Sequence, residues 1–456
     1  MATSPENSKI RPSQGESPVR GELLVDEILT RLPIAAAVRF RAVCREWHAA
    51  LTSDHFITVQ AARARAARHP EIISFSPTAG SSTSFYACSL PVDDGGAPAA
   101  TARKLLTVGG LVGEHIVLSG NRPCRGLTLV FDVRLSEYYV FNLSTGEHVA
   151  LPPCEPAAKI TRRFPRPLDQ RFPRFALELS STGLGFDPTT GEHKVVQLFR
   201  STLDEQKCEV CSPMASGVWR WRPCASGDAP PGLACHIDGR PPVALDGHLY
   251  WLLHPWSFTD NSTRDPPHDA PILSLSVGTK EKNSFGWVHC MQPNLSRHIR
   301  HLTNLDGNLC AIIHNHLIDD MLLLLTWSRE SPSWSVRYRV EVGSLPQPIR
   351  GELSGEREII PLCTVTTAEG KEKVLLATSW HKVYAYDSQS VTTEEVFSMH
   401  HYIDVPYWNN EAQLNIGLLE ERIAGVGRTL AGGTRLQVVK RDGDKFISKR
   451  GVLSEL

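Results

Sequence analysis

The spacing of apolar positions changes sharply near residue 70 of this chain. Between residues 22 and 69 they recur every three or four residues, as at Leu24, Ile28 and Leu32, which is the spacing of one face of an α-helix. Beyond Pro70, short apolar-alternating runs stand between Gly, Pro, Asp and Asn residues, a pattern typical of β-strands joined by turns. The pattern therefore predicts a small helical block followed by a large all-β region.

Three helices are predicted within the block. Pro33 should end the first, because a proline restricts the residue before it and lacks an amide hydrogen. The second is indicated by apolar residues three or four positions apart: Phe40, Val43, Trp47 and Leu51. Ser53 or Asp54 is the expected N-cap of the third, which runs to the His-Pro pair at 69–70.

So small a block contains more large apolar residues than it can bury. An apolar patch left on the surface usually marks a site for a partner. The alternative is that the block packs against the rest of its own chain, and apolar spacing alone does not separate the two interpretations.

The residue identities in the block resemble an F-box, the helical module by which substrate receptors of ubiquitin ligases dock onto a Skp-type adaptor. The matching pieces are Glu27-Ile28-Leu29, Arg31-Leu32-Pro33, RFRAVCR at 39–45, Trp47, and LTSDHF at 51–56. The resemblance implies an SCF-type ligase in which the adaptor joins this chain to a cullin scaffold. It implies these adaptor-facing or supporting residues: Leu24, Ile28, Leu32, Pro33, Val38, Val43, Cys44 and Trp47. Trp47 fits the core of the block equally well.

Two departures from the F-box pattern bear on docking. Family members commonly begin with Leu-Pro, where this chain has Val19-Arg20. They also commonly carry Lys-Ser after the helix-ending proline, where this chain has Ile34-Ala35-Ala36. Either change can weaken adaptor docking, but neither removes the apolar anchors. A propeller scaffold that acts outside ubiquitin transfer is therefore kept as the alternative function.

Two short pieces recur in the β region. FNLSTGEHVA and FDPTTGEHKV begin at 141 and 186, an offset of 45 residues, and LDGHLYW and LDGNLCA begin at 245 and 305, an offset of 60. Each is expected to be a tight turn between two strands, and Asp-Gly is a typical hairpin turn. Units of 45 to 60 residues suit four-stranded propeller blades. The β region therefore predicts a propeller of six to eight blades, with a strand at 435–441 completing the first.

The order of motifs in the β region resembles the F-box-associated β-propeller of plant receptors. The motifs are FDPTTGEHKVV at 186–196, VWRW at 218–221, DGHLYW at 246–251 and ILSLSV at 272–277. Kelch and WD-repeat signatures do not recur at a fixed period. The expected domains are a disordered tail at 1–19, the F-box at 20–60, a helical linker at 61–75 and the propeller at 76–456. The resemblance implies that the propeller binds a protein target whose identity the sequence does not reveal.

Composition mainly excludes classes of partner. A formal net charge of -1 with 21% charged residues gives no reason to expect nucleic acid or membrane. Residues 1–20 lack the apolar segment of a secretory signal, and MLLLL at 321–325 is too short to span a bilayer. We therefore expect a soluble protein of the cytoplasm, the nucleus or both.

Motifs of catalysis and metal binding do not occur in their required contexts. Cys208 and Cys211 lack the second pair that a zinc site needs. We therefore predict a non-enzymatic receptor without metal or cofactor.

One strongly basic stretch, residues 159–174, has six Lys and Arg and three prolines. It is either a solvated loop or an arginine-lined surface for an acidic or phosphorylated target segment. The weak candidates for such target binding are Arg162, Arg163, Arg166 and Arg171.

Overall fold

The computed structural model divides the chain into two compact units, Met1–Arg65 and Ala66–Leu456. It describes residues 28–32, 34–65, 70–78, 82–90, 101–112, 116–120, 122–132, 135–153, 180–200, 206–224, 241–253, 271–278, 285–289, 298–315, 320–353, 359–367, 369–378, 381–399, 416–420, 426, 436–439 and 445–446. The tail predicted at 1–19 lies outside these residues. The first strand begins at Glu71, so the predicted start of the propeller at residue 76 falls inside that strand.

The helical unit contains a 3-10 turn and three short α-helices. They are η2 (Leu29–Arg31), α2 (Ile34–Phe40), α3 (Arg45–Leu51) and α4 (Asp54–Arg65). Of the first predicted helix, the described residues show the end: Ile28 is π-helical, and the 3-10 turn follows it. Leu32 is extended, with φ -72° and ψ 142°, as the following proline requires. The Oγ of Ser53 accepts the N–H of Phe56 at 3.2 Å, which confirms Ser53 as the N-cap of α4.

The prediction of one continuous helix from the alanine-rich stretch to Leu51 is wrong. The backbone leaves the helix between residues 41 and 44, and Cys44 is extended with φ -156° and ψ 169°. The Sγ of Cys44 accepts the N–H of Trp47 at 3.4 Å. Cysteine thus performs the capping function that is usually performed by Ser, Thr, Asp or Asn, and α3 starts anew.

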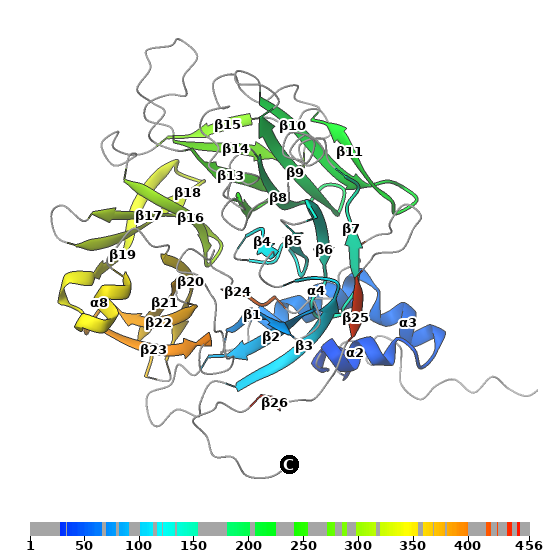
Figure 1. The fold of residues 1–456 in the computed structure, drawn as a ribbon, viewed down its shortest axis with the longest axis horizontal. Coiled ribbons are helices and arrows are strands. Elements are labelled where there is room, and N and C mark those ends of the chain that lie inside the picture. The colour runs from blue at the N-terminus through cyan, green and yellow to red at the C-terminus, as the bar shows by residue number, and fades with distance from the viewer. Residues whose placement is uncertain are drawn as a thin grey trace, which may run out of the picture. The chain divides into compact units, whose positions relative to one another are not determined.

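The second unit is a ring of six antiparallel sheets (Figure 1). Five of them are built from consecutive strands, whose first strand lies nearest the centre in the figure. They are β4 (Ile116–Leu118), β5 (Thr128–Asp132), β6 (Glu137–Phe141), β7 (His148–Ala150); β8 (Ser180–Asp187), β9 (Glu192–Arg200), β10 (Gln206–Pro213), β11 (Trp219–Pro223); β12 (Val243–Leu245), β13 (His248–Leu252), β14 (Ile272–Ser276), β15 (Phe285–Val288); β16 (Ile299–Leu305), β17 (Asn308–Asn315), β18 (Met321–Ser328), β19 (Ser333–Glu341); and β20 (Ile359–Thr366), β21 (Glu372–Thr378), β22 (Lys382–Asp387), β23 (Thr392–Ser398).

The remaining sheet joins both ends of the propeller region and closes the ring. Its strands pair in the order β24 (Ile416–Leu418), β1 (Glu71–Thr78), β2 (Ser82–Ser89), β3 (Thr101–Gly109) and β25 (Gln437–Val439), while β26 (Lys445–Phe446) also pairs with β3. The pairing of β25 with β3 confirms that a strand near residues 435–441 completes the first blade. The six sheets are the six blades of a β-propeller, within the predicted range. We number them in chain order from the blade of β1.

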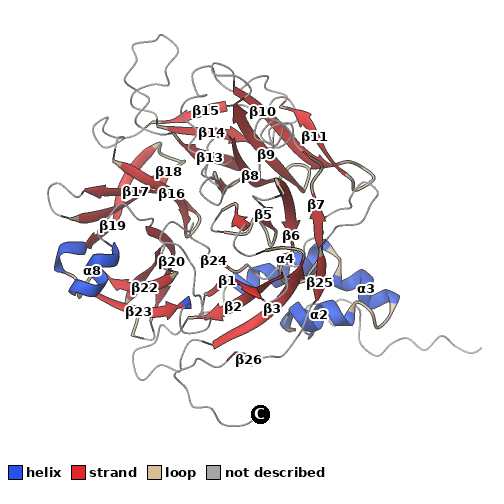
Figure 2. Cartoon of the chain, in the orientation of Figure 1, coloured by secondary structure: helices blue, strands red, loops and turns tan. Residues whose placement is uncertain are grey.

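The apolar core of the propeller lies between blades. Each of its six buried clusters combines side chains from two neighbouring blades, and together they fill all six seams. Both faces of a blade are therefore buried, which explains why β5 is buried at every position. Between β19 and β20 the chain forms η6 (Val342–Ser344) and α8 (Gln347–Leu353). Otherwise the described part of this unit is almost entirely strand and loop (Figure 2).

The two recurring sequence pieces have different structural meanings. LDGHLYW and LDGNLCA are equivalent, since each forms the hairpin between the first and second strands of its blade, the fourth and the fifth. At both turns the φ angles are positive: Asp246 46°, Gly247 72°, Asp306 52° and Gly307 84°. The predicted Asp-Gly hairpins are thus confirmed, and there the 60-residue offset is the distance between blades.

FNLSTGEHVA and FDPTTGEHKV are not equivalent. The first joins the third and fourth strands of the second blade, whereas the second joins the first and second strands of the third blade. The interpretation of their 45-residue offset as a blade repeat is therefore wrong. What the pieces share is a turn in which the Oδ1 of Asn142 or Asp187 accepts the N–H groups of the residues two and three positions further on.

Candidate functional sites in the helical unit and a blade seam

The helical unit buries some of its large apolar side chains. Leu29, Leu51 and Phe56 are 0% exposed and Ile34 is 1% exposed. They come from η2, α3, α4 and α2, elements that contact one another in the order α2 to α3, α3 to α4 and α4 to η2. Ile34, the residue directly after the helix-ending proline, is therefore buried here.

Other large apolar side chains of the described residues lie on the surface. Among the described residues, the exposed large hydrophobic side chains are Ile28 at 50%, Val43 at 62%, Met214 at 45% and Val336 at 45%. Ile28 and Val43 belong to the helical unit, although that unit contributes few of the described residues. Both side chains are therefore accessible to a partner, while single exposed apolar residues such as Met214 and Val336 are common on protein surfaces.

Trp47 combines a structural contact with partial exposure. Its ring meets the ring of Phe40 edge-on, with centroids 5.2 Å apart and an interplanar angle of 78°. Such aromatic pairs contribute about 0.5–1.5 kcal/mol beyond their buried area. Trp47 is half-buried, and its backbone N–H donates to the Sγ of the exposed Cys44. Both alternatives for this residue, core and surface, thus describe part of its side chain.

The structure distributes the eight predicted adaptor residues over three groups. Ile28, Val43 and Cys44 are exposed, and Leu32, Val38 and Trp47 are partly exposed. Leu24 and Pro33 lie outside the described residues, as do the four arginine candidates of the basic stretch, Arg162, Arg163, Arg166 and Arg171. The described adaptor candidates thus remain at least partly accessible.

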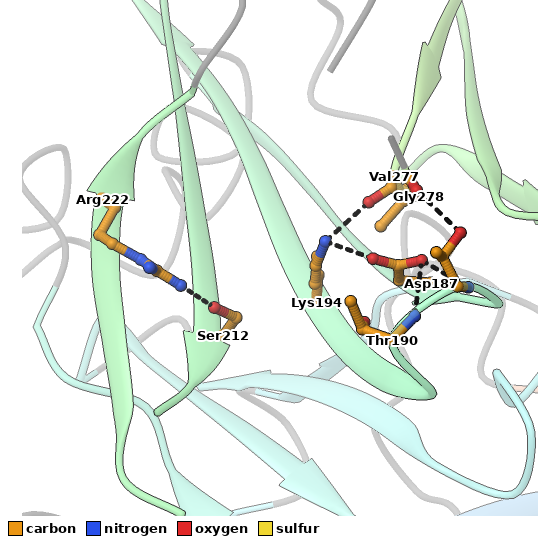
Figure 3. Close-up of polar contacts among 8 residues, drawn as sticks. Asp187, Thr190, Lys194, Ser212, Arg222, Val277 and Gly278 are labelled. Carbon is orange, nitrogen blue, oxygen red and sulfur yellow. Dashed lines mark hydrogen bonds and ion pairs between the residues drawn. The ribbon is translucent and has the colours of Figure 1, made fainter. Parts of the chain in front are cut away.

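The motif FDPTTGEHKVV lies at the seam between the third and fourth blades (Figure 3). The Nζ of Lys194 lies 2.7 Å from Oδ2 of Asp187 and donates to the carbonyl of Val277 at 2.9 Å. The Thr189 hydroxyl donates to the carbonyl of Gly278 at 3.0 Å. Since residues 277 and 278 follow the third strand of the fourth blade, the motif ties one blade to the next.

The carboxylate of Asp187 stays ionised although it is only 1% exposed. Burial alone raises the pKa of a carboxyl group. Here the hydrogen bonds from Lys194, Thr189 and Thr190 outweigh burial and lower the pKa of Asp187 to about 2. Asp187 and Lys194 thus form a buried, hydrogen-bonded ion pair. It acts as a structural staple, a contact that fixes one blade to the next.

Two glycines let the blades approach at the same seam. A Cβ atom on Gly183 would lie 2.2 Å from Cγ of Pro242, and one on Gly185 would lie 2.9 Å from Cγ2 of Val277. Both distances are shorter than carbon atoms tolerate. The small residues before the FDPTTGEHKVV motif are thus required by packing against the fourth blade.

Sequence reasoning missed Arg122. Its Nη2 donates to the carbonyl of Leu362 at 2.7 Å. The bond joins the second blade to β20 of the sixth blade, two blades that are separated in the ring by the first blade. Burial lowers the pKa of Arg122, against the opposing effect of Cys363, Asp306 and Glu420. A lone arginine in a loop carries no local signal of such a long-range contact.

Within the described residues, no group of three or more His, Cys, Asp or Glu side chains is placed to hold a metal ion. Likewise, none of the helices that the structure describes has the length and apolarity needed to cross a membrane.

The F-box domain family matches residues 22–58 of the chain. The chain is an F-box protein with a propeller domain. The match covers the helical unit with its exposed Ile28 and Val43, and it confirms the resemblance found there in the sequence.

Relatives of this F-box protein occur in Arabidopsis thaliana. An F-box/LRR-repeat/kelch-repeat protein is 25% identical over 234 residues, covering 50% of this chain and 57% of the relative. A second F-box protein is 26% identical and covers 51% of this chain and 44% of the relative. An F-box/kelch-repeat protein is 24% identical and covers 50% and 51%. The chain thus spans about half the length of the curated relatives it matches, and their plant origin agrees with the predicted resemblance.

Solved structures resemble the chain only loosely. Citrobacter koseri AztD has a TM-score of 0.32 at 13% identity, covering 78% of this chain and 90% of that one. A fucose-specific lectin from Aleuria aurantia has a TM-score of 0.31 at 7% identity, covering 70% and 91%. Likeness at this level says nothing about a ligand of the F-box protein.

Proposed function

We propose that this F-box protein is the substrate receptor of an SCF-type ubiquitin ligase. The F-box docks onto a Skp-type adaptor and, through it, a cullin scaffold, while the propeller binds a target protein. The observation that carries the proposal is an F-box domain whose Ile28 and Val43 are 50% and 62% exposed. Half-buried Leu32, Val38 and Trp47 complete the docking surface, and Cys44 supports it by capping α3.

Proximity is the physical basis of this function. A receptor that holds its target beside a charged ubiquitin carrier turns transfer into an effectively intramolecular step. The receptor itself then needs two interfaces and a stiff frame rather than a catalytic residue. The six filled blade seams supply such a frame in the propeller. We also propose that the receptor acts in the cytoplasm, the nucleus or both.

The target surface is assigned to one end of the propeller ring. Because strands alternate in direction, connections leave each blade at two opposite ends. At one end they include the short turns at 246–247 and 306–307; at the other end lie the strand ends at Ala150, Pro223, Leu252, Glu341 and Ser398, after which the longer connections of the chain begin. Long connections on a rigid scaffold commonly carry binding specificity. The segment 151–179 contains the four arginine candidates for an acidic target.

Adaptor binding is tested by pull-down with a purified Skp-type adaptor and full-length chain. Val43→Asp places a charge on the proposed docking surface, and at 62% exposure it should leave folding intact. Val336→Asp is the matched control, because Val336 is 45% exposed on β19 of the propeller. We expect wild type and Val336→Asp to bind and Val43→Asp to lose at least tenfold in affinity, with unchanged circular dichroism.

One outcome would overturn the proposed docking surface, and another would overturn the receptor function itself. Equal binding by wild type and Val43→Asp would place the adaptor elsewhere on the F-box. Failure of the folded wild type to bind would make the departures at Val19-Arg20 and Ile34-Ala35-Ala36 decisive. The chain would then fit the alternative of a propeller scaffold that acts outside ubiquitin transfer.

A further inference from the structure

Cys208 and Cys224 face each other on two adjacent strands of the third blade. The register of β10 and β11 pairs Glu209 with Pro223, so Cys208 and Cys224 are the next residues across from each other. The N–H of Cys224 donates to the carbonyl of Cys208 at 2.9 Å. Their side chains are 4% and 5% exposed and lie in the same apolar cluster, at the seam with the fourth blade.

The two thiols are within hydrogen-bond contact. That contact and burial together raise the pKa of Cys208. Opposed residues of a hydrogen-bonded antiparallel pair have Cα atoms about 5.5 Å apart, inside the range of about 4.4–6.8 Å that a disulfide spans. Cys211, the neighbour that the sequence suggests, lies three residues along the same strand and belongs to the seam with the second blade.

We propose that Cys208 and Cys224 form a reversible oxidation site, which a peroxide converts into a disulfide that clamps β11 to β10. Hydrogen peroxide first oxidises one thiolate to a sulfenic acid and is itself reduced to water. The second thiol then attacks the sulfenic sulfur and expels a second water. Two thiols and one peroxide thus yield one disulfide and two waters, and the two sulfur electrons reduce the O–O bond.

The site is slow to oxidise but accessible through the edge of the sheet. Among the described strands, β11 is the outermost of its blade and pairs with β10 alone. A hydrogen bond from Arg222 to Ser212 also joins these two strands (Figure 3). Edge strands open locally more readily than central ones. The raised pKa keeps the thiolate scarce at neutral pH, so oxidation accelerates as pH rises.

The disulfide is also easy to reduce. A hydrogen-bonded antiparallel pair holds its side chains farther apart than a non-hydrogen-bonded pair does, so closing the S–S bond strains the pair. Strained disulfides are the labile ones. Oxidation fastens the strand end from which the connection 224–242 leaves. The modification therefore controls the freedom of that strand end and is independent of adaptor docking.

The test treats folded full-length chain with hydrogen peroxide, alkylates the remaining thiols, and maps peptides by mass spectrometry without reduction. We expect a peptide pair linked through Cys208 and Cys224, faster to form at pH 9 than at pH 7 and reopened by dithiothreitol. Cys208→Ser should lose the linked pair. Cys211→Ser, on the same strand but the opposite face, is the matched control and should keep it.

Amide exchange in β11 provides a measurement on wild type alone, which does not depend on a folded variant. Exchange at Arg220 and Arg222 should slow at least threefold after oxidation and recover after reduction. The proposal is overturned if Cys208 and Cys224 both remain alkylatable while the exposed Cys44 is oxidised. It is also overturned if the link forms only in unfolded chain, or if exchange in β11 does not change when the link forms.

Discussion

Lys194 and Asp187 form an ion pair of 2.7 Å within the third blade, and the same ammonium group donates at 2.9 Å to the carbonyl of Val277 beside the fourth blade. The side chains are 18% and 2% exposed. Both residues belong to the FDPTTGEHKVV motif, whose sequence resembles that of F-box-associated propellers. The motif therefore marks a seam that holds neighbouring blades of the ring together.

Replacing Lys194 by Met should destabilise the propeller substantially. The change leaves the buried carboxylate of Asp187 without its cation and removes the bond to the neighbouring blade. Breaking a buried pair in this way costs about 3–5 kcal/mol. Urea unfolding of the full chain, followed by circular dichroism, should show this loss as a lower midpoint with an unchanged slope.

The control for that experiment is Glu369→Gln. Glu369 pairs with Lys371 at 2.9 Å, but the two side chains are 59% and 46% exposed. Exposed pairs contribute about 0–1 kcal/mol, so the midpoint should barely move. If both substitutions had similar small effects, the Lys194–Asp187 pair would not act as a staple.

Acid should weaken the same seam. The pKa of Asp187 in the folded protein is about 2, below the ordinary value of 3.8 for an aspartate, so its ionised form is favoured by folding. This contribution is complete above pH 4 and is lost as pH falls from 4 towards 2. Unfolding midpoints at pH 5 and pH 3 should therefore diverge more in wild type than in Asp187→Asn. An equal pH dependence in both proteins would contradict the assignment.

Local signals in the helical unit were readable from the sequence, whereas its break was not. The proline at 33 and the cap at Ser53 act on residues within three positions, so they leave a clear pattern. The break before α3 depends on Cys44 accepting a hydrogen bond from Trp47. Because cysteine is an unusual capping residue, apolar spacing alone predicted one helix.

In the propeller, the sequence did not predict which distant segments of the chain contact one another. Asp-Gly turns identified two equivalent hairpins, but the Asn142 and Asp187 turns have the same local chemistry at inequivalent places. The partner of Lys194 at Val277 lies 83 positions away, and Cys208 meets Cys224 rather than Cys211 because the sheet brings them together. Such contacts follow from the fold, so a single sequence does not disclose them.

Packing at the blade seam predicts a strong effect of one added methyl group. Gly185→Ala would place a Cβ 2.9 Å from Val277, and overpacking of this kind costs about 1–3 kcal/mol. Gly351→Ala is the matched control, since its Cβ meets nothing within 4 Å and it lies in α8, where Ala is favoured over Gly. Thermal unfolding should fall for the first variant and hold or rise for the second; the opposite order would refute the close packing.

The N-cap at Ser53 predicts a local effect confined to the F-box. Its Oγ accepts the N–H of Phe56 at 3.2 Å, and Phe56 is 0% exposed. Ser53→Ala should cost about 1 kcal/mol, while Ser53→Asp should retain the cap because Asp is an equally good capping residue. Amide exchange measured by mass spectrometry over residues 53–60 should therefore be about fivefold faster in Ser53→Ala and near wild type in Ser53→Asp. Exchange in the propeller strands should not change, because the capped helix belongs to the other unit. Equal exchange in all three proteins would mean that α4 does not depend on its cap.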